Sequence, residues 1–199
     1  MRNLLLILIT ITFLSFQLSA QKISFVSGNP KALKGISSLD VEFVYADNLH
    51  IGKMTEADYI AKHKKEANAK EAGAGDKWEK SYYADREEHF APKFIELFNK
   101  VLEKKYGMDA RENNSEAKFR MIVTTTFIEP GFNIGIQSRP AFINLEISFV
   151  NIESGEEVAK YKIQKSPGTA YYDLGVRVGE AYAKAAKYFA KFLIKKKAF

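Results

Sequence analysis

Hydrophobic and polar positions alternate between Lys118 and Lys165, and this pattern predicts two or three consecutive antiparallel strands. The apolar positions form three runs: Phe119, Met121, Val123, Thr125, Phe127; Ile143, Leu145, Ile147, Phe149; and Ala159, Tyr161, Ile163. A period of two places each run on one face of a sheet. The tetrad from Glu153 to Glu156 separates the last two strands, and Gly155 supplies the positive φ that such a hairpin needs. We therefore expect a sheet with one apolar face that other elements must cover.

Three shorter segments extend the predicted sheet. Residues from Gln21 to Val26 predict a short edge strand, and Leu39 to Tyr45 alternate again and predict the first central strand. Met108 to Glu112 predict a short strand before the turn at Asn113–Asn114–Ser115.

Two amphipathic helices are expected to cover the apolar face. The first runs from Phe90 to Tyr106, with Gly107 as its stop signal; Pro92 fits its first turn, or marks a kink if the helix begins near Asp85. The second begins at Asp173 as N-cap and ends with three lysines, where cations favour the helix dipole. The apolar stripe of the first helix contains Phe90, Phe94, Leu97, Phe98, Val101 and Leu102. The stripe of the second contains Leu174, Val178, Ala181, Tyr182, Ala185, Phe189, Phe192 and Leu193. The predicted fold class is α+β, a two-layer sandwich of a mostly antiparallel sheet with two main helices on one face.

The segment 55–80 differs in composition, being rich in Ala, Lys and Glu. Thr55 is a candidate N-cap for a helix from Glu56, and Gly73–Ala74–Gly75 is expected to end that helix. This segment has too few apolar residues to form core. We expect one α+β domain over residues 21–199, with 55–80 as a peripheral helical or mobile excursion.

The first 20 residues predict a secretory signal peptide. Arg2 precedes an apolar run from Leu4 to Phe16, and small residues lead to an expected cleavage near Ala20. A retained membrane anchor is the alternative, but the run is shorter than the roughly 20 apolar residues that a spanning helix needs. The chain has no cysteine, which excludes disulfides and the usual bacterial lipid anchor. We expect a bacterial protein that is periplasmic or secreted, with no transmembrane segment after cleavage.

The formal net charge is +6, and it falls to about +5 without Arg2. Export separates the protein from genomic DNA, so we expect no nucleic-acid partner. An anionic envelope surface is one interpretation of this surplus, and an ordinary solvated lysine surface is the other.

Titratable residues offer two weak candidates for chemistry. His63 and Glu66 stand three residues apart on the expected helix, a spacing that suits two metal ligands, but His50 and His89 fall elsewhere in the sequence. A second candidate for acid–base catalysis is the group Asp85, Glu87, Glu88 and His89. Acidic residues in the first turn of a helix are equally explained by their favourable interaction with the helix dipole. We assign no catalytic residue, no cofactor and no metal.

Exposed aromatic and apolar residues offer better candidates. Phe132, Ile134 and Ile136 lie between glycines in a connection, where they form either an interaction tip or a bulged strand that buries them. Two groups of aromatic residues precede the two helices: Trp78, Tyr82 and Tyr83 before the first, and Tyr171 and Tyr172 before the second. Together they either line a pocket for a glycan or apolar ligand, or pack the starts of the helices onto the sheet.

The order of elements, with the hairpin Asn151–Ile152–Glu153–Ser154–Gly155–Glu156–Glu157–Val158, resembles a group of small bacterial envelope domains. These are the amino-terminal domain of the TolB translocation protein and the outer-membrane activator of penicillin-binding proteins. The resemblance covers the topology of roughly residues 39–195 and implies a binding module that is not an enzyme. This chain departs from several relatives by lacking a lipid-accepting cysteine and by carrying the 55–80 segment, so no functional residue is transferred.

The sequence thus favours a non-enzymatic, exported envelope protein, an accessory module that binds another envelope component through its sheet edge or through the Phe132–Ile136 tip. A periplasmic carrier of a small apolar or glycan ligand is the alternative. A metal-dependent hydrolase around His63 or His89 is the third hypothesis.

Overall fold

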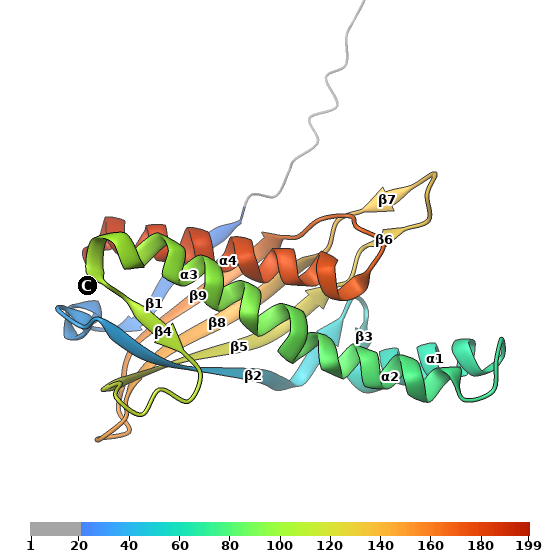
Figure 1. Ribbon diagram of the computed structural model, residues 1–199, viewed down its shortest axis with the longest axis horizontal. Helices are drawn as coiled ribbons and strands as arrows, with labels where there is room; N and C mark the ends of the chain where they lie inside the picture. The colour runs from blue at the N-terminus through green and yellow to red at the C-terminus, as the bar shows by residue number, and fades with distance from the viewer. Residues whose placement is uncertain (1–20) are drawn as a thin grey trace, which may run out of the picture.

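The computed structural model describes residues 21–199, so the predicted signal peptide and its cleavage site lie outside the described residues. A single large sheet is covered on one face by two long helices (Figure 1). The sheet contains β1 (Lys22–Gly28), β2 (Ser38–Ile51), β3 (Met54–Thr55), β4 (Asp109–Arg111), β5 (Phe119–Glu129), β8 (Phe142–Asn151) and β9 (Glu157–Pro167). A separate hairpin contains β6 (Phe132–Asn133) and β7 (Ser138–Arg139). The helices are α1 (Glu56–Asn68), α2 (Ala74–Asp85), α3 (Ala91–Tyr106) and α4 (Leu174–Lys196), with a 3₁₀ turn η1 (Pro30–Leu33) and a π-helical turn η2 (Arg86–Phe90).

The strand order is β1-β9-β8-β5-β2-β3, with β4 paired to β2. The predicted meander is confirmed, because β5, β8 and β9 pair antiparallel in sequence order. The expected edge strand, the first central strand and the short strand correspond to β1, β2 and β4. Only the pairs that β2 makes with β4 and β5 are parallel, so the sheet is mostly antiparallel, as expected.

The prediction of the apolar face is wrong at one position, Phe127. The pairing of β5 with β8 shifts between Thr125 and Phe127, so Ile128 rather than Phe127 takes the buried position. Such a bulge changes which residues face inward from that point on. Phe127 instead stacks on Phe142, with ring centroids 5.5 Å apart.

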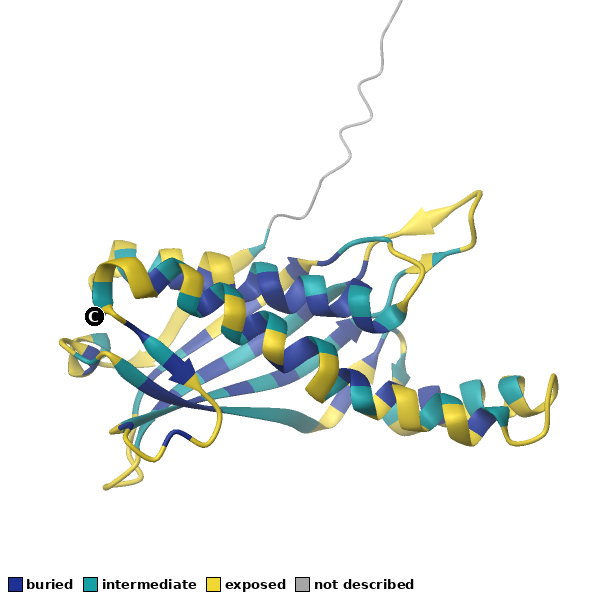
Figure 2. Cartoon of the chain, viewed as in Figure 1, coloured by how far each residue is buried: buried dark blue, intermediate teal, exposed yellow. Residues whose placement is uncertain are grey.

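α3 and α4 supply the cover that the sheet requires. Phe94, Phe98, Tyr182 and Phe189 are fully buried, and Figure 2 shows the buried faces of both helices turned toward the strands. Phe189 joins the layers, because its ring lies 6.3 Å from Phe98 of α3 and 5.1 Å from Tyr161 of β9. Burying one such side chain stabilises the fold by about 1.5–3 kcal/mol. The predicted two-layer α+β architecture is confirmed.

The segment 55–80 is a helical hairpin that projects from one end of the sheet (Figure 1). Thr55 caps α1 as expected, accepting a hydrogen bond from the Asp58 amide at 3.2 Å. The expected helix end at Gly73–Ala74–Gly75 is wrong, because α1 ends at Asn68 and these residues begin α2. Gly75 is packed so closely on α1 that a methyl group there would come 2.6 Å from the Lys64 carbonyl oxygen. Ala, Lys and Glu favour helix on both sides of the reversal, so composition did not locate it.

α2 continues through η2 into α3, so the helix begins well before Phe90. The Ala91 amide donates to the carbonyl of Arg86, five residues back, in the π-helical turn. Pro92 follows directly and has no amide hydrogen to donate, so it cannot make the backbone hydrogen bond of a regular α-helix. The π-helical turn lies next to this interruption of the hydrogen-bond pattern. Pro92 thus lies in the first turn of α3, which is the first of the two positions expected for it.

Within the described residues, no helix has the length and hydrophobicity required to cross a bilayer.

Candidate functional site

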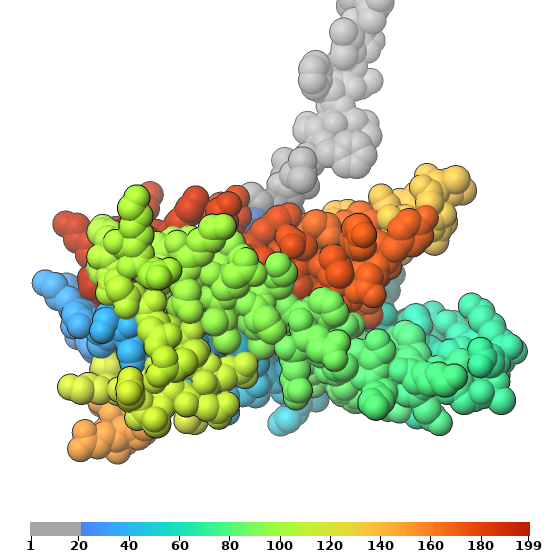
Figure 3. Space-filling view, in the orientation of Figure 1, coloured from blue at the N-terminus to red at the C-terminus, as the bar shows by residue number. Residues whose placement is uncertain are grey.

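The β6–β7 hairpin exposes the three apolar residues of the predicted tip. Phe132 is 40% exposed, Ile134 62% and Ile136 92%. The hairpin projects from the body beside the segment that leads into α4 (Figure 3). Of the two interpretations of this connection, the structure therefore shows exposure rather than burial.

Local bonds hold the hairpin in shape. Gly131 has φ 60° at its base, and a methyl group there would come 2.3 Å from the Arg139 carbonyl oxygen, so this close approach requires glycine. Across the turn, the Ile134 amide donates to the carbonyl of Gln137 at 3.0 Å. The Asn133 side chain accepts from the Gly135 amide at 2.9 Å and donates to the Ala170 carbonyl at 2.7 Å. The last bond joins the hairpin to the segment before α4.

That segment contributes two more exposed rings. Tyr171 is 60% exposed and Tyr172 68%. A methyl group at Gly135 would lie 3.3 Å from the Tyr172 hydroxyl, so this tyrosine lies against the hairpin turn. We call the five residues Phe132, Ile134, Ile136, Tyr171 and Tyr172 the apolar tip.

Arg177 of α4 ties the two parts of the apolar tip together. Its guanidinium is buried and donates to the carbonyls of Tyr171 at 2.6 Å and Tyr172 at 2.5 Å. Its Nε donates to the carbonyl of Pro130, at the base of the hairpin, at 3.0 Å. Burial lowers the pKa of Arg177 from its ordinary value, while the charge lets its planar fork bind several carbonyls at once. Sequence reasoning missed this residue, because a lone arginine in a helix looks like a surface residue.

The other aromatic group lies in the helical hairpin and packs within it. Trp78 stacks between His63 and Tyr82, with ring centroids 4.8 Å and 5.4 Å away. The Tyr82 hydroxyl donates to Glu56 of α1 at 2.5 Å, and Tyr83 stays partly exposed. Within residues 21–199, no ring of this group contacts Tyr171 or Tyr172. The rings of this group therefore join α2 to α1, and they do not form one pocket with the pair before α4.

Arg86 fastens the same hairpin to the sheet. Its guanidinium carbon lies 3.7 Å from the centre of the Tyr45 ring of β2, and its Nη2 lies 2.5 Å from Glu56. Burial is the main cause that raises the pKa of the Tyr45 hydroxyl. Sequence reasoning missed this arrangement too, since its members come from β2, α1 and η2.

Asp85, His89 and Asp173 form the only group of three potential metal ligands in residues 21–199, with ligand atoms within 4.8 Å of one another. Asp85 Oδ1 and His89 Nδ1 are 3.0 Å apart, and burial raises the pKa of Asp85. Both carboxylates lie at the start of α4: Asp173 caps the Val176 amide at 2.8 Å, and Asp85 packs on Gly175. A helix N-terminus stabilises anions and disfavours cations. The group therefore stabilises the start of α4 and is a poor match for a metal ion.

The remaining acid–base candidates do not converge. His63 Nδ1 is 3.9 Å from Glu66, but its ring stacks on Trp78, and burial lowers its pKa. His50 bonds the Asn48 carbonyl at 2.9 Å in an exposed position. Glu87 and Glu88 are exposed on η2. No role in catalysis follows from these positions.

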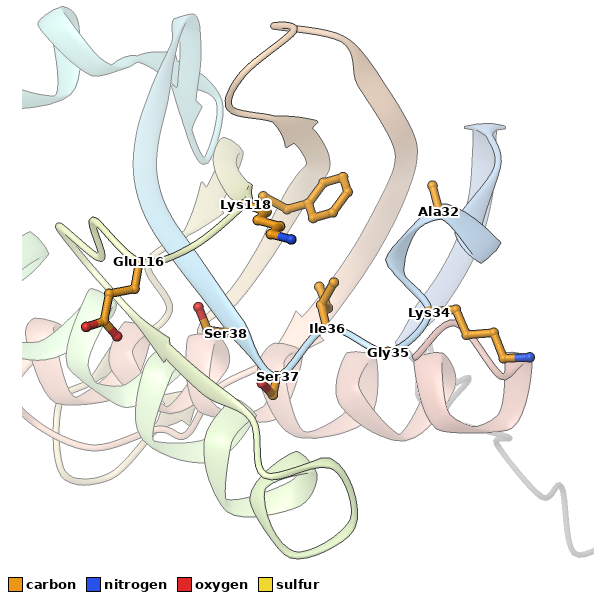
Figure 4. Close-up of a pocket in the computed structure, with 9 residues that line it drawn as sticks. Ala32, Lys34, Gly35, Ile36, Ser37, Ser38, Glu116 and Lys118 are labelled. Carbon is orange, nitrogen blue, oxygen red and sulfur yellow. The ribbon is translucent and has the colours of Figure 1, made fainter.

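A pocket of about 500 Å³ lies between the loop before β2 and the start of β5. The charged residues that line it are Lys34, Glu116 and Lys118. Figure 4 shows the charged ends of these three side chains well apart from one another. The charged groups of this pocket therefore do not converge, as groups that orient a ligand do.

Comparison with known proteins finds no matching family model and no matching curated protein. Solved structures with a similar arrangement include the PelC dodecamer from Paraburkholderia phytofirmans, with 11% identity, covering 84% of this chain and 96% of that chain at a TM-score of 0.42. Another is a DUF330 protein from Xanthomonas campestris, with 11% identity, covering 86% and 92% at a TM-score of 0.37. Neither is one of the proteins named in the predicted resemblance, which therefore stays a prediction. At these values the likeness supports no conclusion about function.

Proposed function

We propose that this protein is a non-enzymatic binding module of the bacterial envelope and that its apolar tip docks another envelope protein. The observation that carries the proposal is the exposure of Phe132, Ile134 and Ile136 on a hairpin that is fixed to the body by hydrogen bonds. Grouped exposed apolar side chains mark interaction sites, and aromatic residues such as Phe and Tyr are enriched at the centre of protein interfaces.

Preorganisation strengthens this assignment. The Arg177 contacts and the Asn133–Ala170 bond hold both parts of the tip before any partner arrives. A rigid surface loses less conformational entropy on binding, so more of the contact energy contributes to affinity.

The location in the envelope is part of the proposal. It rests on the predicted signal peptide, the absence of cysteine and the resemblance to envelope binding domains. The carrier alternative receives no support from the aromatic residues, because their two groups do not share a pocket.

A photocrosslinking residue at Ile136 tests the docking role in cells. We expect it to capture a defined envelope protein, whereas the same residue at Ile152, which is exposed in the β8–β9 turn, captures none. The captured protein is then purified and titrated with wild type and variants. The double change Ile134→Ser and Ile136→Ser should raise the Kd at least tenfold, since central interface residues each contribute 1 kcal/mol or more.

Ile152→Ser is the matched control, and we expect its Kd to stay within twofold of wild type. An unchanged Kd for the double tip variant would remove the docking role of the tip. Equal crosslinking from Ile136 and Ile152 would do the same, because capture would then not depend on the tip.

A further inference from the structure

A second candidate site lies away from the apolar tip, in a groove between the outer face of α4 and the start of β1. This groove is open to solvent and has a volume of about 530 Å³. Its lining consists of Gln21, Ile23, Pro167, Tyr188, Lys191, Phe192 and Lys195. Volumes of this size hold single small molecules in other proteins.

The groove combines an apolar floor with a positive rim. Ile23, Tyr188 and Phe192 supply hydrocarbon and aromatic surface, while Lys191 and Lys195 come from successive turns of α4. No acidic side chain lines it, and in residues 21–199 no ion pair engages either lysine. Lys191 Nζ lies 5.8 Å from the centre of the Tyr188 ring, so charge and apolar surface adjoin.

Gln21 adds a donor without a partner. Its side-chain nitrogen is buried and makes no hydrogen bond, and its residue forms part of the groove wall. An unpaired buried donor costs stability, so this end of the groove wall is not optimised for the fold alone. The groove therefore presents two ammonium groups beside an apolar floor.

We propose that this groove binds a single-chain anionic amphiphile of the fatty-acid type. The carboxylate pairs with Lys191 and Lys195, and the alkyl chain lies along Ile23, Tyr188 and Phe192. The groove is open to solvent, but its volume of about 530 Å³ suits one such molecule, so we commit to a monomeric ligand rather than the surface of a bilayer. This site is independent of the apolar tip and of the protein partner proposed for it.

Calorimetric titration of the purified protein with dodecanoate, below its micelle concentration, tests the site. We expect saturable binding of one molecule, at least tenfold tighter than binding of dodecyltrimethylammonium, which has the opposite charge. Octanoate should bind at least tenfold more weakly than dodecanoate, because each methylene removed from the groove loses burial.

The charge reversal Lys191→Glu with Lys195→Glu should weaken dodecanoate binding at least tenfold. The control is Lys104→Glu with Lys105→Glu in the last turn of α3, which changes the net charge equally and includes a lysine near an aromatic ring, Lys105 over Tyr106 at 5.2 Å. We expect the control to bind within twofold of wild type. Thermal unfolding of both variants establishes that they are folded.

Three results would overturn the proposal. The first is equal affinity for the anionic and the cationic probe. The second is an equal loss of dodecanoate binding in the two double-lysine variants. The third is binding to anionic phospholipid vesicles with no binding to monomeric dodecanoate. The last result would assign the lysines to a membrane surface instead.

Discussion

Single residues decide how the apolar tip is presented. Ile134 and Ile136 are exposed because a glycine-dependent hairpin carries them away from the sheet, and Tyr172 lies against that hairpin. Arg177 holds both segments although it contributes no exposed surface of its own. The tip therefore depends on a buried cation as much as on its apolar members.

Arg177→Lys should loosen the tip and destabilise the fold. A lysine keeps the charge but has no planar fork, so it cannot reach the carbonyls of Pro130, Tyr171 and Tyr172 together. We expect a loss of about 2 kcal/mol in the free energy of unfolding, measured by urea denaturation. Hydrogen exchange at the Ile134 amide should also quicken.

Arg111→Lys is the control for this change. Arg111 pairs with Asp109 and Glu116 at a half-exposed position, where ion pairs contribute little, and the expected loss is about 0.5 kcal/mol or less. Equal losses in the two variants would show that the buried contacts of Arg177 stabilise the fold no more than the half-exposed contacts of Arg111 do.

At the scale of elements, the two faces of the sheet have separate tasks. The inner face of β5, β8 and β9 is buried under α3 and α4, and the outer face pairs charges across strands. Glu146 of β8 lies 2.9 Å from both Lys160 and Lys162 of β9. Hydrogen bonds from these lysines lower the pKa of Glu146 below its usual value near 4.5.

This lowered pKa gives Glu146→Gln a defined pH dependence. Because the folded-state pKa of the carboxyl is depressed, its stabilisation is present above pH 4.5 and is lost as pH falls through the lowered pKa. The variant should be less stable than wild type at pH 7, by roughly 0.5 kcal/mol for a partly exposed pair. At pH 2 the two proteins should unfold at the same denaturant concentration.

Glu153→Gln, in the exposed β8–β9 turn, serves as the control and should follow the wild-type stability at both pH values. A stability difference for Glu146→Gln that is the same at pH 7 and pH 2 would contradict the role given to its charge.

Across the whole molecule, burial is uneven. α4 buries twelve residues against the sheet and α3, whereas α1 buries only Tyr59 and Ile60. The α1–α2 hairpin is held by its own aromatic rings, by the contact of Arg86 with Tyr45, and by the continuation of α2 into η2. The body and the projecting hairpin should therefore differ in local stability.

Native-state hydrogen exchange measures this difference. Amides of α1 should exchange through local opening, with protection well below that of amides in the middle of α4, whose opening requires global unfolding. Equal protection in α1 and α4 would show that the hairpin and the body unfold as one unit.

The sequence by itself determined the class of the fold and most of its elements. Apolar residues recur with a period of two in β5, β8 and β9 and at helical spacing in α3 and α4. Both periods come from the local geometry of the backbone, so the sequence pattern identifies these elements directly. Caps at Thr55 and Asp173 and the turn at Gly155 are equally local. These signals sufficed to predict that Phe94, Phe98, Tyr182 and Phe189 would be buried together.

Only the tertiary structure decided which residues form sites. The bulge that turns Phe127 away from the core depends on pairing with β8, and the reversal at Gly73–Ala74–Gly75 depends on packing between two helices. The apolar tip joins residues about 40 positions apart through Arg177, and the groove joins Gln21 to Lys195. Such contacts form between segments distant in the chain, and no local period records them.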